Sequence, residues 1–299
     1  MERKKLYIIG NGFDLHHEIR SAYGDFKAFL KKEDWSLFRL VEDYLPVGQE
    51  WNELEMALGD IDVAYMVDNN AMFLPSYAAD DWSDSGHHDF QYEISKIVNN
   101  LSSTLRTQFA NWVRQIEIPD ATSAQNRLST LDINGLYLTF NYTSTLASVY
   151  SVPMVNILHI HGEAALPDTV VLGHAWNPNE RKSLNDHSGV EDQDTQVTEA
   201  YDILDGYFSA TFKPLEKIIQ ENAPFFAGLR NIEEVFVLGH SLSDVDLNYF
   251  EAVVKAIDID AVRWAIACRN SVEMEDKHAA IAMLGVPARR IYTQLWNDI

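Results

Sequence analysis

LYIIGNGFDL, residues 6–15, is the stretch that decides the fold class. Its first four residues are apolar, and a short apolar run of this kind predicts a strand covered on both faces. Gly10 and Gly12 follow, and a G-x-G turn between a strand and a helix lets the backbone approach a phosphate. A full dinucleotide fingerprint has Gly or Ala where this chain has Leu15, so a plain tight turn is the alternative. Asp14 would repel a phosphate, and we expect it to cap the helix or to contact a sugar hydroxyl.

The composition favours a folded cytoplasmic protein. Of 299 residues, 46% are hydrophobic, which is enough to bury a large core. The single cysteine, Cys268, lies in an apolar run and predicts a buried, reduced thiol. The basic start of the chain precedes an apolar run too short for a signal peptide, and no run reaches the length that spans a bilayer. We therefore expect a cytoplasmic protein that does not bind membranes.

Acidic residues outnumber basic ones, and the formal net charge is -22 at pH 7. No Lys or Arg occurs in residues 40–95 or 183–212. Because nucleic acids bind mainly to Lys and Arg, we expect no nucleic-acid partner. If a nucleotide binds, its phosphates must rely mostly on backbone N–H groups at helix N-termini.

Short β-rich runs alternate with helical patterns along the chain. These runs are LYIIG, GLYLTFN, VNILHIHG, VVLGH, VFVLGHS and VRWAIACR, and most are continuously apolar. Strands and helices that alternate in this way predict an α/β fold with a Rossmann-like, doubly wound and mostly parallel sheet.

Two regions, at about residues 35–132 and 177–231, lack strand patterns. The first contains a stripe of apolar residues at helical spacing: Phe90, Ile94, Ile97, Leu101, Leu105 and Phe109. We expect both regions to be helical insertions in one α/β domain that spans residues 1–299.

Polar side chains follow two predicted strands in the middle of the chain. Asn141, in LTFNYTSTL, lies at the carboxyl end of a strand, where ligands of open α/β sheets bind; a capping or turn-forming role is the alternative. His159 and His161, in ILHIHGE, lie on one face of a strand by its period of two. His161 is then a candidate general base. Alternatively the pair ligates a metal with His174 or His240, in a metal-dependent hydrolase or nuclease.

The segment VFVLGHSLSDVDLNYF, residues 235–250, contains a second strand-to-helix turn. Its G-H-S-L-S sequence is similar to the nucleophile elbow G-x-S-x-G. However, Ser243 replaces the final Gly, and His278 is the only histidine that follows Ser241 along the chain. A turn that presents N–H groups and hydroxyls to a ligand is the favoured interpretation. Ser243 and Asp246 also predict a capping box for the next helix.

Taken in order, LYIIGNGFDL, SAYGDF, WNELEMAL, TFNYTSTL, HIHG and VLGHSLSDVDLNYF resemble the AbiH family of bacterial abortive-infection proteins over almost the whole chain. That family in turn is similar to the sirtuin-like NAD-binding fold. The resemblance implies a phage-defence enzyme that hydrolyses its substrate NAD to nicotinamide and ADP-ribose. The four-cysteine zinc module of sirtuins is missing, which argues against a protein deacylase.

The resemblance also implies which residues contact NAD. Asn141 and His161 would be catalytic at the reacting ribose, with His161 as the base and Asn141 orienting a water or a ribose hydroxyl. The nucleotide-binding set would be Gly10, Asn11, Gly12, Phe13, Asp14, Gly239, His240, Ser241 and Asp244. No metal ligand is assigned, and the roles of Glu55 and His159 stay open.

A non-catalytic sensor is the alternative function, in which the same pocket binds NAD or ADP-ribose and regulates a partner. In both cases the expected ligand is a small nucleotide. Assembly into a homo-oligomer and contact with a phage-derived trigger or a partner defence protein stay open.

Overall fold

The computed structural model describes residues 4–74, 88–166, 169–186 and 194–299. The chain divides into two compact units. The first, called the sheet unit, consists of Met1–Ala22, Ala110–Val171 and Pro214–Ile299. The second, called the helical unit, consists of Tyr23–Phe109 and Leu172–Lys213.

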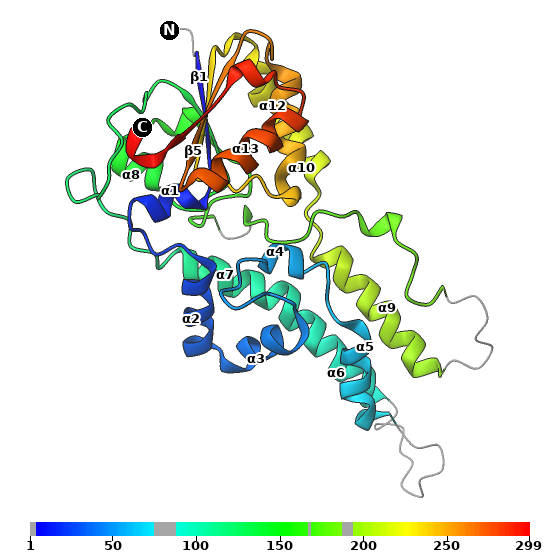
Figure 1. The fold of residues 1–299 in the computed structure, drawn as a ribbon. Helices are drawn as coiled ribbons and strands as arrows, with labels where there is room; N and C mark the ends of the chain where they lie inside the picture. The colour runs from blue at the N-terminus through cyan, green and yellow to red at the C-terminus, as the bar shows by residue number, and fades with distance from the viewer. Residues whose placement is uncertain (1–3, 75–87, 167–168, 187–193) are drawn as a thin grey trace, which may run out of the picture. The chain divides into compact units, whose positions relative to one another are not determined.

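A parallel sheet forms the core of the sheet unit (Figure 1). Its strands are β1 (Lys5–Ile9), β2 (Leu136–Thr139), β3 (Ile157–His159), β4 (Glu234–Leu238), β5 (Arg263–Cys268) and β6 (Ile291–Leu295). They lie in the order β3-β2-β1-β4-β5-β6, and every neighbouring pair is parallel. This order is that of doubly wound nucleotide-binding folds, so the expected Rossmann-like fold class is confirmed.

The strand register aligns the carboxyl ends of four strands. His159 pairs with Thr139, Thr139 with Ile9, and Ile9 with Leu238, so these residues form one row across the sheet edge. The chain leaves β1 toward β2 on one side and later returns to β4 on the other. The switch point, at which ligands of such sheets bind, therefore lies between β1 and β4.

Apolar side chains on the two faces of the sheet explain why the strands are continuously apolar. Tyr7 stacks on Tyr137 and on Phe236, with ring centroids 4.8 and 4.9 Å apart. The helices of this unit are α1 (Asn11–His16), α8 (Thr145–Tyr150), α10 (Leu215–Glu221), α11 (Ala223–Ala227), α12 (Leu247–Ala256) and α13 (Ser271–Met283). Phe13 of α1 and Val149 of α8 pack into the same core cluster as Tyr7.

The helical unit contains α2 (Tyr23–Glu33), α3 (Trp35–Tyr44), α4 (Leu54–Ala57), α5 (Val63–Asn70), α6 (Asp89–Asn99), α9 (Thr195–Ala210) and most of α7 (Leu105–Val113). A π-helical segment, η3 (Asn100–Thr104), joins α6 to α7. All six residues of the predicted helical stripe from Phe90 to Phe109 are buried, so this expectation is confirmed. Among the ranges that the structure describes, no helix is long and apolar enough to cross a membrane.

Short 3-10 segments complete the two units. They are η1 (Ala71–Phe73), η4 (Met154–Asn156), η6 (Pro178–Glu180), η7 (Gly228–Asn231), η8 (Asp244–Asp246), η9 (Ala288–Arg290) and η10 (Trp296–Asp298). The capping box expected at Ser243 is wrong: Ser243 precedes η8 without a side-chain cap, and α12 begins only after Asp246.

The helical regions differ in extent from the expected insertions at about 35–132 and 177–231. The helical unit already begins at Tyr23, because Phe26 of α2 packs on Trp51 and Phe109. Residues 110–132 and 214–231 belong to the sheet unit instead.

Three strand expectations need correction. The run VVLGH forms no strand; His174 makes one isolated bridge to Phe212. β3 ends at His159, because β2 offers no partner beyond Thr139, so His161 lies in the turn after the strand. β6 is an edge strand in which most residues are partly exposed, and its sequence did not predict a strand.

Candidate functional site

The turns after β1 and β4 pack against each other at the switch point. The Gly10 N–H donates to the Leu238 carbonyl at 3.0 Å, and the Gly12 N–H donates to the Gly239 carbonyl at 2.8 Å. Gly239 has φ +74°, and a Cβ there would overlap the backbone nitrogen of Phe13. A Cβ on Gly10 or Gly12 would likewise overlap the β4 turn. Glycine is therefore required at these positions for backbone contact between the turns.

This contact bears on the predicted phosphate site. The N–H groups of Gly10, Gly12 and Phe13 all donate to protein carbonyls, the last to Gly10 at 2.9 Å. They are thus already hydrogen-bonded without a ligand. The assignment of Gly10 and Gly12 to a pyrophosphate stays a prediction.

The other residues predicted to contact the nucleotide differ in burial and in hydrogen bonding. Asn11 exchanges hydrogen bonds with Ser21, and Phe13 is buried against His17 and Tyr150. Ser241 and Asp244 are exposed. Within the described residues, no hydrogen bond joins Ser241 to a histidine, so the arrangement of a nucleophile elbow is not formed.

Asp14 is fully buried and holds the chain that follows β2. Its Oδ2 accepts a hydrogen bond of 2.6 Å from Thr143, whose Oγ1 lies 3.2 Å from that of Thr145. Burial raises the pKa of Asp14 to about 6, while the side chains of Thr143, Thr145 and Asn141 act to lower it. Its second oxygen, Oδ1, is buried and has no hydrogen-bond partner among the residues that the structure describes. The carboxyl group is therefore poorly solvated, and the expectation that it caps α1 is wrong, because the cap of that helix is Gly10.

Asn141 lies two residues beyond the row of strand ends, at the end of β2, and only 7% of it is exposed. Both Nδ2 and Oδ1 are buried without a hydrogen-bond partner in the part of the chain that the structure describes, although the amide is near enough to Asp14 to lower its pKa. Buried amides in native proteins almost always have partners. The Asn141 amide is thus available to a ligand that brings both a donor and an acceptor.

His161 and His240 share one carboxylate, that of Asp246. His161 Nε2 lies 3.6 Å from Asp246 Oδ1, and His240 Nε2 lies 3.5 Å from Asp246 Oδ2. All three residues are buried. Each histidine lies two residues beyond the aligned strand ends, after β3 and β4 respectively, so the sheet register brings together residues that are far apart in sequence.

Aromatic rings enclose both histidines. Phe140, at the end of β2, meets His161 and His240 edge-on, with centroid distances of 5.1 and 4.3 Å. Tyr249 lies 5.4 Å from His161, and Phe250 lies 4.9 Å from His240. The imidazoles are therefore held in one orientation in an apolar setting.

His159 is hydrogen-bonded to the backbone of Asn141. The carbonyl of Asn141 lies 3.0 Å from its Nδ1 and accepts the Nδ1 proton, which fixes the tautomer. Burial lowers the pKa of His159. The metal alternative needed a third ligand, His174 or His240, beside His159 and His161; the described ranges contain no group of three His, Cys, Asp or Glu side chains that could hold a metal ion.

The model of the family described as bacteriophage abortive infection AbiH matches residues 6–268. This chain belongs to the AbiH family. Its broad role is therefore in abortive infection, the bacterial response to phage. Comparison with curated proteins gave no match.

In this AbiH protein, sequence reasoning missed Asp246 as a site residue. It was expected only to cap a helix, whereas its carboxylate lies between His161 and His240. A weak signal was present, because Asp246 follows the β4 turn in the same segment as Gly239 and His240.

Glu55 of the AbiH chain lies in the helical unit and has partners there. Its Oε1 accepts a hydrogen bond of 2.6 Å from the Tyr23 hydroxyl, and its Oε2 lies 2.6 Å from Lys213 Nζ. Lys213 is fully buried. Glu55 therefore has a structural role as the counter-charge of a buried ammonium group.

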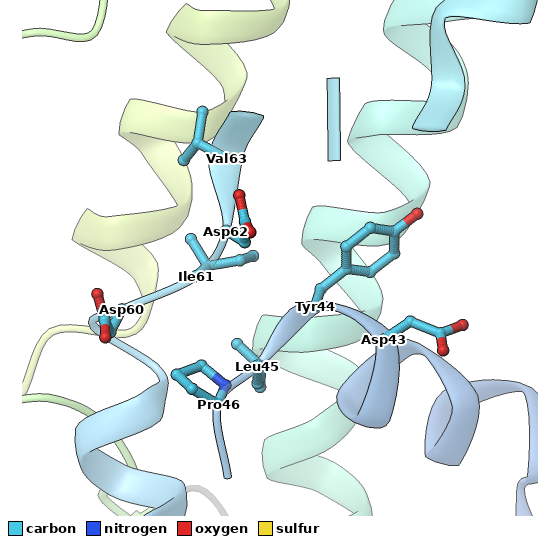
Figure 2. A pocket seen from close by; sticks show the side chains of 8 residues that line it. All are labelled: Asp43, Tyr44, Leu45, Pro46, Asp60, Ile61, Asp62 and Val63. Atoms are coloured by element: carbon cyan, nitrogen blue, oxygen red, sulfur yellow. The ribbon is translucent and has the colours of Figure 1, made fainter. Parts of the chain in front are cut away.

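An open hollow of about 540 Å³ lies in the helical unit between the end of α3 and the connection from α4 to α5 (Figure 2). It is lined by Asp43, Tyr44, Leu45, Pro46, Asp60, Ile61, Asp62 and Val63. Asp43 pairs with Arg39, and Asp62 caps α5 through the Tyr65 N–H. No predicted site residue of this AbiH chain lines the hollow.

Proposed function

We propose that this AbiH protein hydrolyses NAD to nicotinamide and ADP-ribose. The observation that carries the proposal is the Asn141 amide at the end of β2: its donor and acceptor are both buried, and neither has a hydrogen-bond partner among the described residues. An unpaired buried amide costs free energy, which a hydrogen-bonding ligand offsets. The strand order supports a dinucleotide as that ligand, because such sheets bind dinucleotides at the switch point.

The residues around Asn141 suit cleavage of a glycosidic bond. Hydrolysis breaks the bond between the ribose C1′ and the nicotinamide nitrogen, and the electron pair leaves with nicotinamide. A water molecule forms the new C1′–O bond and gives its proton to a base. We assign His161 as that base and Asn141 as the group that orients the water or a ribose hydroxyl. Phe140, the neighbour of Asn141, packs on the His161 ring and supports a shared site.

The test follows nicotinamide release from NAD by chromatography. We expect His161→Gln to lower turnover about 10²–10⁴-fold, the usual contribution of a general base. Asn141→Ala should also lower turnover, because it removes the orienting amide. His278→Gln is the matched control: it changes a histidine of the same unit that lies on α13 and has no assigned role, and it should leave turnover unchanged.

Because abortive infection responds to phage, the assay is also run on extracts of phage-infected cells that express each variant, with NAD measured over time. Equal NAD loss with wild type and His161→Gln would overturn the proposal. So would an absence of nicotinamide release by the wild type in both settings.

A non-catalytic sensor is the second candidate. It is favoured by the burial of His161, which is only 2% exposed, because a base must return its proton to solvent after each turnover. Calorimetry with ADP-ribose separates the candidates: binding by the wild type without NAD loss in infected cells supports a sensor.

A further inference from the structure

We infer that Asp246 is a positioning residue that sets the tautomers of His161 and His240. The catalytic consequence of this inference rests on the proposed function, in which His161 is the base. The inference itself concerns the ligand-free protein and can be tested without NAD.

The tautomer of His240 follows from its two neighbours. The Leu242 N–H donates to His240 Nδ1 at 2.9 Å, so this nitrogen carries the lone pair. The neutral ring therefore carries its proton on Nε2, which faces Asp246 Oδ2 at 3.5 Å. Leu242 has φ +61°, a conformation that is uncommon for a residue with a Cβ, and this conformation belongs to the turn that brings its N–H to the ring.

The same carboxylate then acts on His161. Asp246 Oδ1 lies 3.6 Å from His161 Nε2, beyond hydrogen-bond distance, so the carboxylate acts on this nitrogen through its negative charge. The arrangement therefore favours the proton on Nε2 and the lone pair on Nδ1. Nδ1 is the nitrogen that would take a proton from the attacking water, and the carboxylate would stabilise the imidazolium that forms.

The packing around the three residues makes this geometry hard to rearrange. Phe140, Tyr249 and Phe250 enclose the two imidazoles, so neither ring can turn without displacing an aromatic side chain. Asp246 also precedes the first turn of α12, where a negative charge is favourable. The carboxylate is thus held between the rings from the start of α12.

Asp246→Asn tests the inference sharply, because it keeps the size of the side chain but adds two donors. Since Leu242 fixes His240 as a donor at Nε2, the new amide oxygen should face His240 and the new NH₂ group should face His161. His161 would then accept at Nε2 and carry its proton on Nδ1. Glu251→Gln, an exposed carboxylate on α12 that pairs with Lys255, is the control.

Long-range ¹H–¹⁵N correlation spectra of the full ligand-free chain report the tautomer of each histidine. We expect protonation at Nε2 for His161 and His240 in the wild type and in Glu251→Gln, and a switch of His161 to Nδ1 in Asp246→Asn. Turnover of NAD should fall about 10³–10⁴-fold in Asp246→Asn, as when the carboxylate of a catalytic triad becomes an amide. The affinity for ADP-ribose should change less than about threefold.

Wild-type His161 with its proton on Nδ1 would overturn the inference, even if Asp246→Asn failed to fold. If Asp246→Asn kept the histidine tautomers and the NAD turnover of the wild type, the inference would also be overturned. A switched His161 tautomer with unchanged turnover would support the positioning role and contradict the assignment of His161 as the base. Expected tautomers in a protein without NAD turnover would likewise support the inference and count against the proposed function.

Discussion

At the scale of single residues, Asp14 is a fully buried carboxyl group in the sheet unit. Its pKa is raised to about 6, mainly by burial, and within the described ranges one of its oxygens has no hydrogen-bond partner. Between about pH 4 and pH 6 the folded protein therefore keeps a proton that the unfolded chain releases. Stability then falls as pH rises through this window, which is opposite to the usual behaviour of a paired carboxylate.

Asp14→Asn should remove this dependence, because the amide is neutral and its oxygen can still accept from Thr143. Relative to this variant, the wild type should lose on the order of 3 kcal/mol of unfolding free energy between about pH 4 and pH 6.5. Urea unfolding of both proteins at several pH values measures the difference. A wild type that gains stability relative to the variant over this range would contradict the argument.

Asp120 provides a control of opposite sign. It is exposed, and hydrogen bonds from Thr122 and Ser123 hold its pKa well below the usual range. Relative to Asp120→Asn, the wild type should lose stability as pH falls below about 4, since the folded carboxylate must then be protonated. Comparison of the two variants separates two causes of a pH-dependent stability: burial of the carboxyl group at Asp14 and hydrogen bonding to it at Asp120.

At the scale of elements, the contact between the turns after β1 and β4 sets the geometry of the switch point. Gly239 lies in the left-handed region, and its α-carbon faces the backbone of Gly12 and Phe13. This contact fixes the distance between the two turns. It therefore also fixes the distance between the residues that follow β1 and those that follow β4.

Gly239→Ala should lower the unfolding free energy by about 2–4 kcal/mol, through the positive φ and the overlap with Phe13. Gly206→Ala is the matched control, because Gly206 lies inside α9 and an added Cβ there would meet nothing within 4 Å. It should stabilise the protein by up to about 1 kcal/mol through helix propensity. Thermal and urea unfolding measure both changes, and a Gly239→Ala variant as stable as the wild type would disprove the close contact.

At the scale of the whole molecule, two discontinuous units share one chain, and each must join segments that are far apart in sequence. In the helical unit, Glu55 from the first segment pairs with Lys213 at the end of the second. Lys213 is fully buried, so its ammonium group needs this counter-charge.

Glu55→Gln should lower the unfolding free energy by about 3–5 kcal/mol, because it removes the carboxylate that lies 2.6 Å from the buried ammonium group of Lys213. Lys96→Gln is the control in the same unit, since Lys96 forms an exposed pair with Glu93 and should change stability by less than about 0.5 kcal/mol. Equal stability of Glu55→Gln and Lys96→Gln would contradict a structural role for the buried pair.

The sequence was sufficient to predict those strands and helices that depend only on neighbours along the chain. Short apolar runs predicted the strands from β1 to β5, and a stripe with helical spacing predicted α6 and α7. It was insufficient for β6, for the early end of β3 and for the VVLGH run, because strand length depends on whether a partner strand continues beside it.

By itself, the sequence of this protein determined the α/β class, the helical stripe from Phe90 to Phe109 and the candidates Asn141 and His161, because strand and helix periodicity and the residues that end each element are local properties. Only the tertiary structure decided the strand order, the contact between the glycine turns and the placement of Asp246 between His161 and His240. The physical reason is the sheet register: it aligns the ends of β3, β2, β1 and β4 in one row, and so brings side chains from distant segments within a few ångströms of one another.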